Sequence, residues 1–236
     1  MRDVLLFVPC FVDLLDPEVG QATVLLLERA GLRVHYPPEQ TCCGQPAFTS
    51  GHHVEARVVA SRAAEVFMRA GRELGECRDV VTPSASCAGF MAHELQGLGV
   101  THDLVVHELF EFLEQELDAG ESLGGEARAR RAVLHPACHL LRGMGGDAAL
   151  RRLLARVPGL ELVTSGEEES CCGFGGIFAA REPAVSVAMA RTKIDAARTV
   201  GAELIISSDS SCGMQLASIA QGLPVVNAVS VLAGMA

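Results

Sequence analysis

Residues 4–10 read VLLFVPC, and residues 132–138 read AVLHPAC. Each stretch is a short apolar run that passes through a proline to a cysteine, and each predicts a buried strand that ends at its cysteine. The second stretch follows the first by 128 positions in a chain of 236 residues. A repeat at this distance indicates that one half of the chain duplicates the other.

The cysteines repeat with the same spacing. Eight of the nine fall into two matched sets, which are Cys10, Cys42, Cys43 and Cys87 in the first half and Cys138, Cys171, Cys172 and Cys212 in the second. Counterparts lie 125 to 129 positions apart, as expected for a duplication with small changes in the loops. Quartets of thiolates hold metal ions or iron–sulfur clusters in proteins. The pattern therefore predicts two metal–sulfur sites built to one design.

The segments between the cysteines alternate between strand and helix patterns. Short apolar runs at residues 32–36, 79–82 and 103–106 recur at 160–164, 204–207 and 223–226, and alanine-rich helical patterns lie at 54–70 and 183–200. This alternation predicts an α/β fold with two duplicated Rossmann-like halves, each a parallel sheet flanked by helices. We place the halves at residues 1–120 and 129–236. The Gly-, Glu- and Arg-rich residues 117–131 are the predicted connection.

The predicted topology explains how distant cysteines could meet. Each cysteine of a set follows a predicted strand or opens a predicted helix, and these points share one edge of an open parallel sheet. Helix N-termini also lower the pKa of a nearby thiol, which favours the thiolate form. Gly44 and Gly173, next to the paired cysteines, would let the backbone approach a bulky inorganic centre closely.

Composition excludes several classes of function. The net charge is −10, Lys193 is the only lysine, and no stripe of basic residues is present, so we expect no nucleic-acid partner. No run approaches the ~20 apolar residues of a membrane span, and residues 4–8 lack the features of a signal peptide, so we expect a cytoplasmic protein without direct membrane insertion. Disulfides are rare in the cytoplasm, and nine cysteines there favour metal or redox chemistry.

Three interpretations of the cysteine sets remain open at this point. The first is iron–sulfur ligation by four thiolates, which adjacent cysteines suit better than they suit a small tetrahedral ion. The second is structural zinc, which usually shows a C-x₂₋₄-C knuckle that this sequence lacks. The third is a collection of inert buried thiols or disulfides.

At these residues the chain resembles the CCG-domain (cysteine-rich domain) family of iron–sulfur proteins. The likeness is carried by residues 8–13 (VPCFVD), 42–51 (CCGQPAFTSG), 82–87 (TPSASC), 135–139 (HPACH) and 171–178 (CCGFGGIF). Members of the family include B subunits of heterodisulfide reductase, iron–sulfur subunits of glycolate and glycerol-3-phosphate dehydrogenases, and lactate utilization proteins, which this chain resembles most.

The resemblance implies a function. All eight matched cysteines would ligate iron–sulfur clusters, of the 4Fe–4S type and one per half, and the chain would pass electrons during oxidation of L-lactate or another 2-hydroxy acid. It would act as an accessory redox subunit without catalytic residues, beside a ferredoxin-type iron–sulfur subunit and a further lactate-utilization subunit. The sequence shows no flavin or nicotinamide motif, so hydride removal is expected on a partner. The alternatives are a heterodisulfide-reductase-like thiol/disulfide redox protein and the iron–sulfur subunit of a glycolate oxidase.

The chain departs from the fullest family pattern, which ends each set in C-x-x-C. Ser84 and Asp209 stand at the earlier position, so each site has four thiolates and not five, which argues against disulfide cleavage. Asp209 is a candidate oxygen ligand, but the preferred interpretation is helix N-capping by Ser84, Ser86, Asp209 and Ser211. His139 is a candidate hydrogen-bond partner of the Cys138 sulfur. Cys77 has no counterpart and is predicted not to be a ligand.

Overall fold

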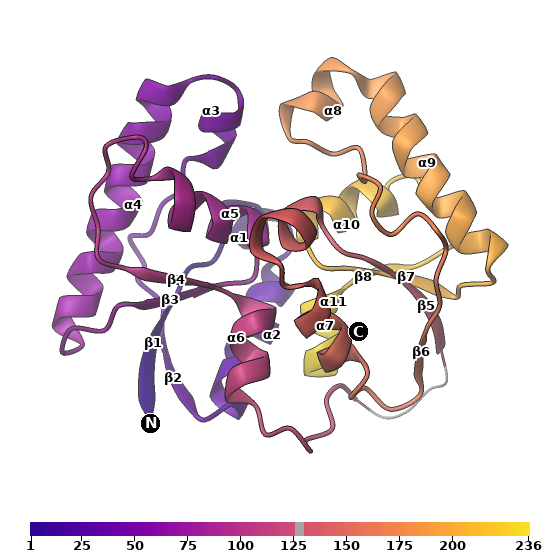
Figure 1. The fold of residues 1–236 in the computed structure, drawn as a ribbon, viewed down its shortest axis with the longest axis horizontal. Helices are drawn as coiled ribbons and strands as arrows, with labels where there is room; N and C mark the ends of the chain where they lie inside the picture. The colour runs from indigo at the N-terminus through magenta and orange to yellow at the C-terminus, as the bar shows by residue number, and fades with distance from the viewer. Residues whose placement is uncertain (126–129) are drawn as a thin grey trace. The chain divides into compact units, whose positions relative to one another are not determined.

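The computed structural model describes residues 1–125 and 130–236. The chain separates into two compact units, Met1–Asp118 and Ala119–Ala236 (Figure 1). Our boundary of 129 for the second half falls outside the described residues, so the halves 1–120 and 129–236 stay a prediction at their inner ends. Part of the predicted connection belongs to the second unit, because the N–H of Gly124 donates to the Leu232 carbonyl oxygen over 2.8 Å.

The first unit is a four-stranded parallel sheet in the order β2-β1-β3-β4. Its elements are β1 (Arg2–Leu6), α1 (Cys10–Leu15), α2 (Pro17–Arg29), β2 (Leu32–His35), α3 (Gln45–Thr49), α4 (His53–Glu73), β3 (Asp79–Thr82), α5 (Ala85–Gly89), the π-helical turn η1 (Phe90–Glu94), β4 (Val105–Glu108) and α6 (Leu109–Glu116). Strands β1 and β3 lie in the middle of the sheet, and Leu5, Leu6, Val80 and Val81 on them are almost completely buried. Such continuous apolar strands are typical of a sheet covered on both faces.

The second unit repeats the same topology with the strand order β6-β5-β7-β8, again all parallel. Its elements are β5 (Arg130–His135), the π-helical turn η2 (His139–Met144), α7 (Asp147–Leu154), β6 (Leu160–Leu162), α8 (Ile177–Arg181), α9 (Pro183–Thr199), β7 (Leu204–Ser207), α10 (Ser210–Ala217), β8 (Val225–Asn227) and α11 (Ala228–Ala233). The two sheets confirm the predicted fold class of two duplicated α/β halves.

Some boundaries differ from the sequence prediction. Strands β1 and β5 end at Leu6 and His135, a few residues before their cysteines, because the chain then turns into a helix that begins at or next to the cysteine. The last strand of the second unit begins at Val225, after Pro224, which has no N–H to donate to the neighbouring strand. Within the described residues, no helix has the length and apolarity needed to cross a membrane.

Each unit keeps its long helix close to the sheet through small residues. In α4, the buried positions include Ala56, Ala60 and Ala64, and the helix also contributes Phe67 to the core around Phe7. Ala190 and Ala197 play this part in α9. Small side chains allow close packing of helix on sheet, and the loop between the second strand and this helix is thereby held at the carboxyl edge.

Candidate metal–sulfur sites

The first cysteine set gathers at the carboxyl edge of the first sheet. Cys10 is the first residue of α1, Cys42 and Cys43 lie in the loop between β2 and α3, and Cys87 lies in the first turn of α5. The Sγ atoms of Cys10 and Cys42 are 3.6 Å apart, and those of Cys43 and Cys87 are 3.5 Å apart. Cys43 and Cys87 are buried, whereas Cys10 and Cys42 are partly exposed. The site therefore has an inner and an outer pair of sulfurs.

Hydrogen bonds within the first set favour a thiolate at Cys42. The Cys10 thiol donates to Cys42 Sγ, and this bond, supported by the Cys43 thiol, lowers the pKa of Cys42. The same bonds raise the pKa values of Cys10 and Cys43. We had expected helix starts to lower the pKa of these thiols, and for Cys10 this expectation is wrong. Thiol–thiol hydrogen bonding and burial there outweigh the field of a short helix.

The second cysteine set gathers at the corresponding edge of the second sheet. Cys138 directly precedes η2, Cys171 and Cys172 lie in the loop before α8, and Cys212 lies in the first turn of α10. The Cys172 thiol donates to Cys212 Sγ over 3.1 Å, and both residues are buried. Cys138 and Cys171 are partly exposed and interact electrostatically. Inner and outer pairs thus recur at the same positions as in the first unit.

Three thiols of the second set, those of Cys138, Cys171 and Cys172, are held in the neutral form. The hydrogen bond from the Cys171 thiol to Cys172 raises the pKa of Cys171. This bond lowers the pKa of Cys172, but the bond to Cys212 and burial outweigh it and raise that pKa to about 12. Burial also raises the pKa of Cys138. Ligation at this site would therefore release protons, as metal binding by thiols generally does.

Backbone N–H groups point at the sulfurs in both units. The Gly44 N–H donates to Cys42 Sγ over 3.5 Å, and in the second unit the N–H groups of Gly173 and Phe174 donate to Cys171 Sγ and Cys172 Sγ, each over 3.4 Å. Both glycines have a left-handed backbone, with φ of +100° at Gly44 and +86° at Gly173. A Cβ atom at Gly44 would lie 2.8 Å from the Ala56 carbonyl oxygen. A Cβ atom at Gly173 would overlap the Ser186 carbonyl oxygen. These positions require glycine because of the backbone conformation and the neighbouring carbonyl oxygens, and the close approach to an inorganic centre stays a prediction.

The second site also contains a buried imidazole that sequence reasoning missed. His135 ends β5 with 1% of its surface exposed, and neither ring nitrogen has a hydrogen-bond partner among the described residues. One ring nitrogen lies within 4.8 Å of the sulfurs of Cys172 and Cys212. Burial, together with the charge of Lys193, lowers the pKa of His135 to about 3, so the ring is neutral. The available signal was a histidine in an otherwise apolar strand.

Lys193 is the second basic residue at this site that was missed. It lies in α9 with 5% of its surface exposed. Its Nζ donates to the carbonyl oxygens of Glu167 and Ser170, in the loop that leads to Cys171. Burial lowers the pKa of Lys193, while interactions with nearby groups that include Cys172 and Cys171 oppose this shift. A lone lysine inside a predicted helix was the sequence signal.

The residues at the position of a fifth sulfur differ between the units. Asp209 N-caps α10, and its carboxylate accepts from the N–H of Ser211 over 3.0 Å, which confirms the capping interpretation for Asp209. Ser84 occupies the N-cap position of α5 but makes no capping bond through its side chain, so the prediction is wrong there. Its hydroxyl instead lies 3.0 Å from that of Ser86, which is inside the helix and not at its cap. Ser211 is likewise inside its helix.

Two weaker candidates also have defined places. His139 Nδ1 lies 3.7 Å from Cys138 Sγ, the sulfur for which it was a candidate hydrogen-bond partner. Cys77 lies away from the set of four, because its thiol donates to the carbonyl oxygen of Asp3 at the amino end of β1, over 3.3 Å.

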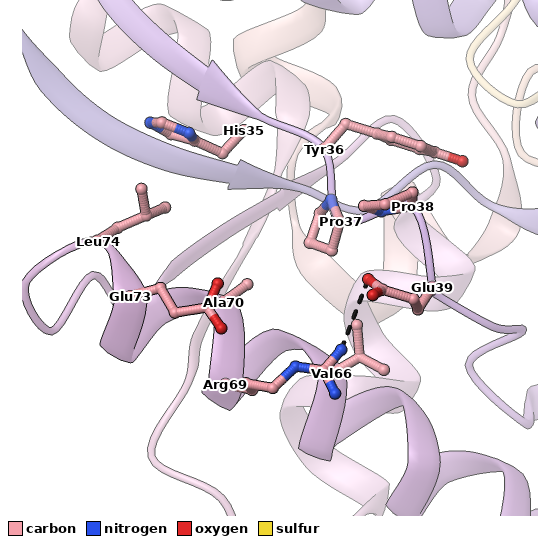
Figure 2. A pocket seen from close by; sticks show the side chains of 10 residues that line it. All are labelled: His35, Tyr36, Pro37, Pro38, Glu39, Val66, Arg69, Ala70, Glu73 and Leu74. Carbon is pink, nitrogen blue, oxygen red and sulfur yellow. Dashed lines mark ion pairs between the residues drawn. The ribbon is translucent and has the colours of Figure 1, made fainter.

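A hollow of about 230 Å³ beside β2 and α4 is lined by residues that include the ion pair between Arg69 and Glu39 (Figure 2). Among the described residues that line it there is no cysteine, so it is separate from the sulfur site.

The donor atoms fit a soft metal centre. Each set offers four sulfurs, and backbone N–H groups are directed at the sulfur atoms. Thiolates select zinc or iron–sulfur clusters, whereas magnesium and calcium prefer oxygen. The clustered cysteines therefore indicate a site for a metal ion or an iron–sulfur cluster.

Comparison with known proteins defines the class. The family model of the cysteine-rich domain, CCG, matches residues 4–92 and 132–217, one match in each unit. The chain belongs to the CCG cysteine-rich domain family.

Individual relatives narrow the comparison. The chain is 40% identical to lactate utilization protein A of Exiguobacterium sp. over 225 residues, which cover 92% of this chain and 89% of the relative. It is 38% identical to lactate utilization protein A of Geobacillus kaustophilus over 243 residues, which cover 96% of this chain and 97% of the relative. Among solved structures, a hypothetical protein from Helicobacter pylori superposes with a TM-score of 0.58 at 10% identity, which shows the fold alone. That match covers 99% of this chain and 49% of the solved one, so the chain spans about half its length.

Proposed function

We propose that this chain is an iron–sulfur electron-transfer subunit of a system that oxidises L-lactate, with one 4Fe–4S cluster in each unit. The supporting observation is the pair of four-cysteine sites in a chain 40% identical to a lactate utilization protein A. The proposed ligands are Cys10, Cys42, Cys43 and Cys87 in the first unit and Cys138, Cys171, Cys172 and Cys212 in the second.

A bound cluster supplies one-electron chemistry, and the surrounding residues have separate tasks. The inner sulfurs, such as those of Cys43 and Cys172, anchor the site within the core. The N–H groups of Gly44 and Gly173 donate to sulfur and offset the negative charge of the thiolates. The outer cysteines, Cys10 and Cys138 among them, keep one side of each site near the surface. Electrons can be exchanged with a partner through that side.

Removal of hydride from lactate is assigned to a partner. Iron–sulfur clusters carry electrons and do not remove hydride, and this chain has no flavin or nicotinamide motif in its sequence. The proposed partners are a ferredoxin-type iron–sulfur subunit and a further lactate-utilization subunit, in the cytoplasm. The chain is then an accessory redox subunit of an oxidoreductase complex and contains no catalytic residue of its own.

The experiment is reduction of the clusters by substrate. The chain is co-purified anaerobically with its partners, and electron paramagnetic resonance is recorded after addition of L-lactate or of glycolate. We expect L-lactate to reduce the clusters of this chain and glycolate to do so poorly. Reduction by glycolate alone would assign the chain to glycolate oxidation. If neither acid reduces iron–sulfur clusters that dithionite does reduce, the chain is not part of a 2-hydroxy-acid pathway.

A further inference from the structure

The two sites have the same sulfurs but different neighbours. His135 is the fourth residue of the stretch AVLHPAC, and the fourth residue of VLLFVPC is Phe7. Lys193 follows Ser186, whose carbonyl oxygen faces Gly173, by seven positions, and Ala63 follows Ala56, whose carbonyl oxygen faces Gly44, by the same number. Phe7 and Ala63 are both buried and apolar. The first unit thus has two apolar residues where the second unit has an imidazole and an ammonium group.

His135 is placed to interact with the sulfurs. It is almost completely buried and has no hydrogen-bond partner among the described residues, although burying an unpaired polar group is costly. A neutral imidazole carries one N–H in either tautomer. One ring nitrogen lies within 4.8 Å of Cys172 Sγ and Cys212 Sγ, which can accept a hydrogen bond. Phe7 offers no such donor, and its ring packs against Phe67 with 5.5 Å between centroids.

Lys193 reinforces this difference through its charge. Its Nζ is fixed by the carbonyl oxygens of Glu167 and Ser170 and by the Ser170 hydroxyl, over 2.9 Å and 3.1 Å for the two Ser170 atoms. It interacts electrostatically with Cys171 and Cys172. The imidazole and the ammonium group therefore both act on the sulfurs of the paired cysteines.

We propose that His135 donates an N–H···S hydrogen bond to the cluster of the second unit, and that this bond and the charge of Lys193 give the second cluster the more positive reduction potential. Hydrogen bonds to sulfur and nearby positive charge stabilise the reduced cluster, which carries one more electron. Four thiolates already supply four ligands, so the imidazole acts as a donor and not as a ligand. The inference rests on the proposed function, since it requires a cluster in each unit.

The test compares potentials in His135→Phe, which gives the second unit the residue of the first. Iron and acid-labile sulfide are measured first, and redox titrations followed by electron paramagnetic resonance then give both potentials, with Cys43→Ser as a background in which the second cluster is observed alone. We expect the wild-type second cluster to have the more positive potential. His135→Phe should make the potential of the second cluster more negative by ~59 mV. For a one-electron couple this is a tenfold change in the ratio of oxidised to reduced cluster. Lys193→Met should shift the potential in the same direction.

A second measurement leaves His135 unchanged. Pulsed electron paramagnetic resonance of protein labelled with ¹⁵N-histidine should show a weak nitrogen coupling to the second cluster both in wild type and in His139→Gln, a variant that removes the other histidine near a sulfur of this site. His135→Gln, which keeps an N–H donor, should retain much of the wild-type potential. Loaded protein with no histidine coupling, or with a potential that His135→Phe leaves unchanged, would overturn the inference while the proposed function stands. Protein without iron and sulfide would instead overturn the proposed function.

Discussion

The two units of this molecule keep the same scaffold and differ in what touches the sulfurs. Both have a four-stranded parallel sheet with the same strand order, and both place an inner and an outer pair of cysteines at its carboxyl edge. The neighbours of the inner pair differ, however: Phe7 shares a core cluster with Cys43 and Cys87, whereas His135 lies within 4.8 Å of the Cys172 and Cys212 sulfurs. The comparison separates the features that hold a cluster from those that adjust its properties. The cysteines and the sheet that positions them are duplicated, whereas the residues next to the sulfurs differ between the units.

The largest expected effect comes from removing one inner thiolate in either unit. We expect Cys43→Ser and Cys172→Ser each to abolish the cluster of its own unit and to leave the other intact, because serine oxygen is a poor ligand for a soft iron–sulfur centre. Iron and sulfide should fall by about half, and electron paramagnetic resonance should show which signal is lost. Cys77→Ser is the matched control and should keep all of the iron. Full iron content in Cys172→Ser would refute the ligand assignment in the second unit.

A smaller effect is expected at the glycines beside the paired cysteines. Alanine at a left-handed position costs about 1–2 kcal/mol, and Gly173→Ala adds an overlap with the Ser186 carbonyl oxygen. We expect urea unfolding of the metal-free protein to show Gly173→Ala as the more destabilised, by about 3 kcal/mol, and Gly44→Ala by about 2 kcal/mol. Gly31→Ala, at φ +77° with open space around it, should show the backbone cost alone. Equal losses at all three positions would show that the close approach at Gly173 is unimportant.

The helices after the last strands allow a test by pH. Glu108 caps α6, and Asn227 caps α11 at the matching strand end. Burial raises the pKa of Glu108 to about 8, from an ordinary value of 4.5. The folded state thus binds the proton more tightly than the unfolded state, and the stability provided by protonated Glu108 is complete below pH 4.5 and lost as the pH rises toward 8.

Glu108→Gln should therefore remove the pH dependence that Glu108 gives to the first unit. We expect the free energy of unfolding of the wild type to fall by more than about 1 kcal/mol between pH 5 and 8.5 relative to the variant. Urea unfolding of both proteins at the two pH values measures this difference, and Asn227→Asp would introduce an acid at the matching position as a control. Parallel pH profiles for wild type and Glu108→Gln would show that Glu108 is not the group responsible.

Much of the fold followed from sequence because strands and helices depend on local patterns. The runs at 79–82 and 204–207 form β3 (Asp79–Thr82) and β7 (Leu204–Ser207) with unchanged limits. The gathering of the cysteines followed from the topology, since parallel strands share a carboxyl edge. Their role as cluster ligands stays a prediction.

What could not be predicted depends on which way a side chain points in three dimensions. The sequence shows that His135 is in a strand, but not that its ring faces Cys172 and Cys212, whose positions 37 and 77 residues later depend on the folded loops. Lys193 reaches backbone carbonyl groups 23 and 26 residues away, and a helical pattern carries no sign of such partners. The sequence likewise does not show that the Ser84 hydroxyl lies next to the Ser86 hydroxyl and makes no capping bond, because this depends on the direction of the side chain.

The most direct test of two duplicated iron–sulfur sites is the iron and acid-labile sulfide content of anaerobically purified protein. Two 4Fe–4S clusters predict about eight iron atoms and eight sulfides per chain, with no stoichiometric zinc. Colourless protein that contains about two zinc ions and no sulfide would contradict the account and would make both cysteine sets structural zinc sites.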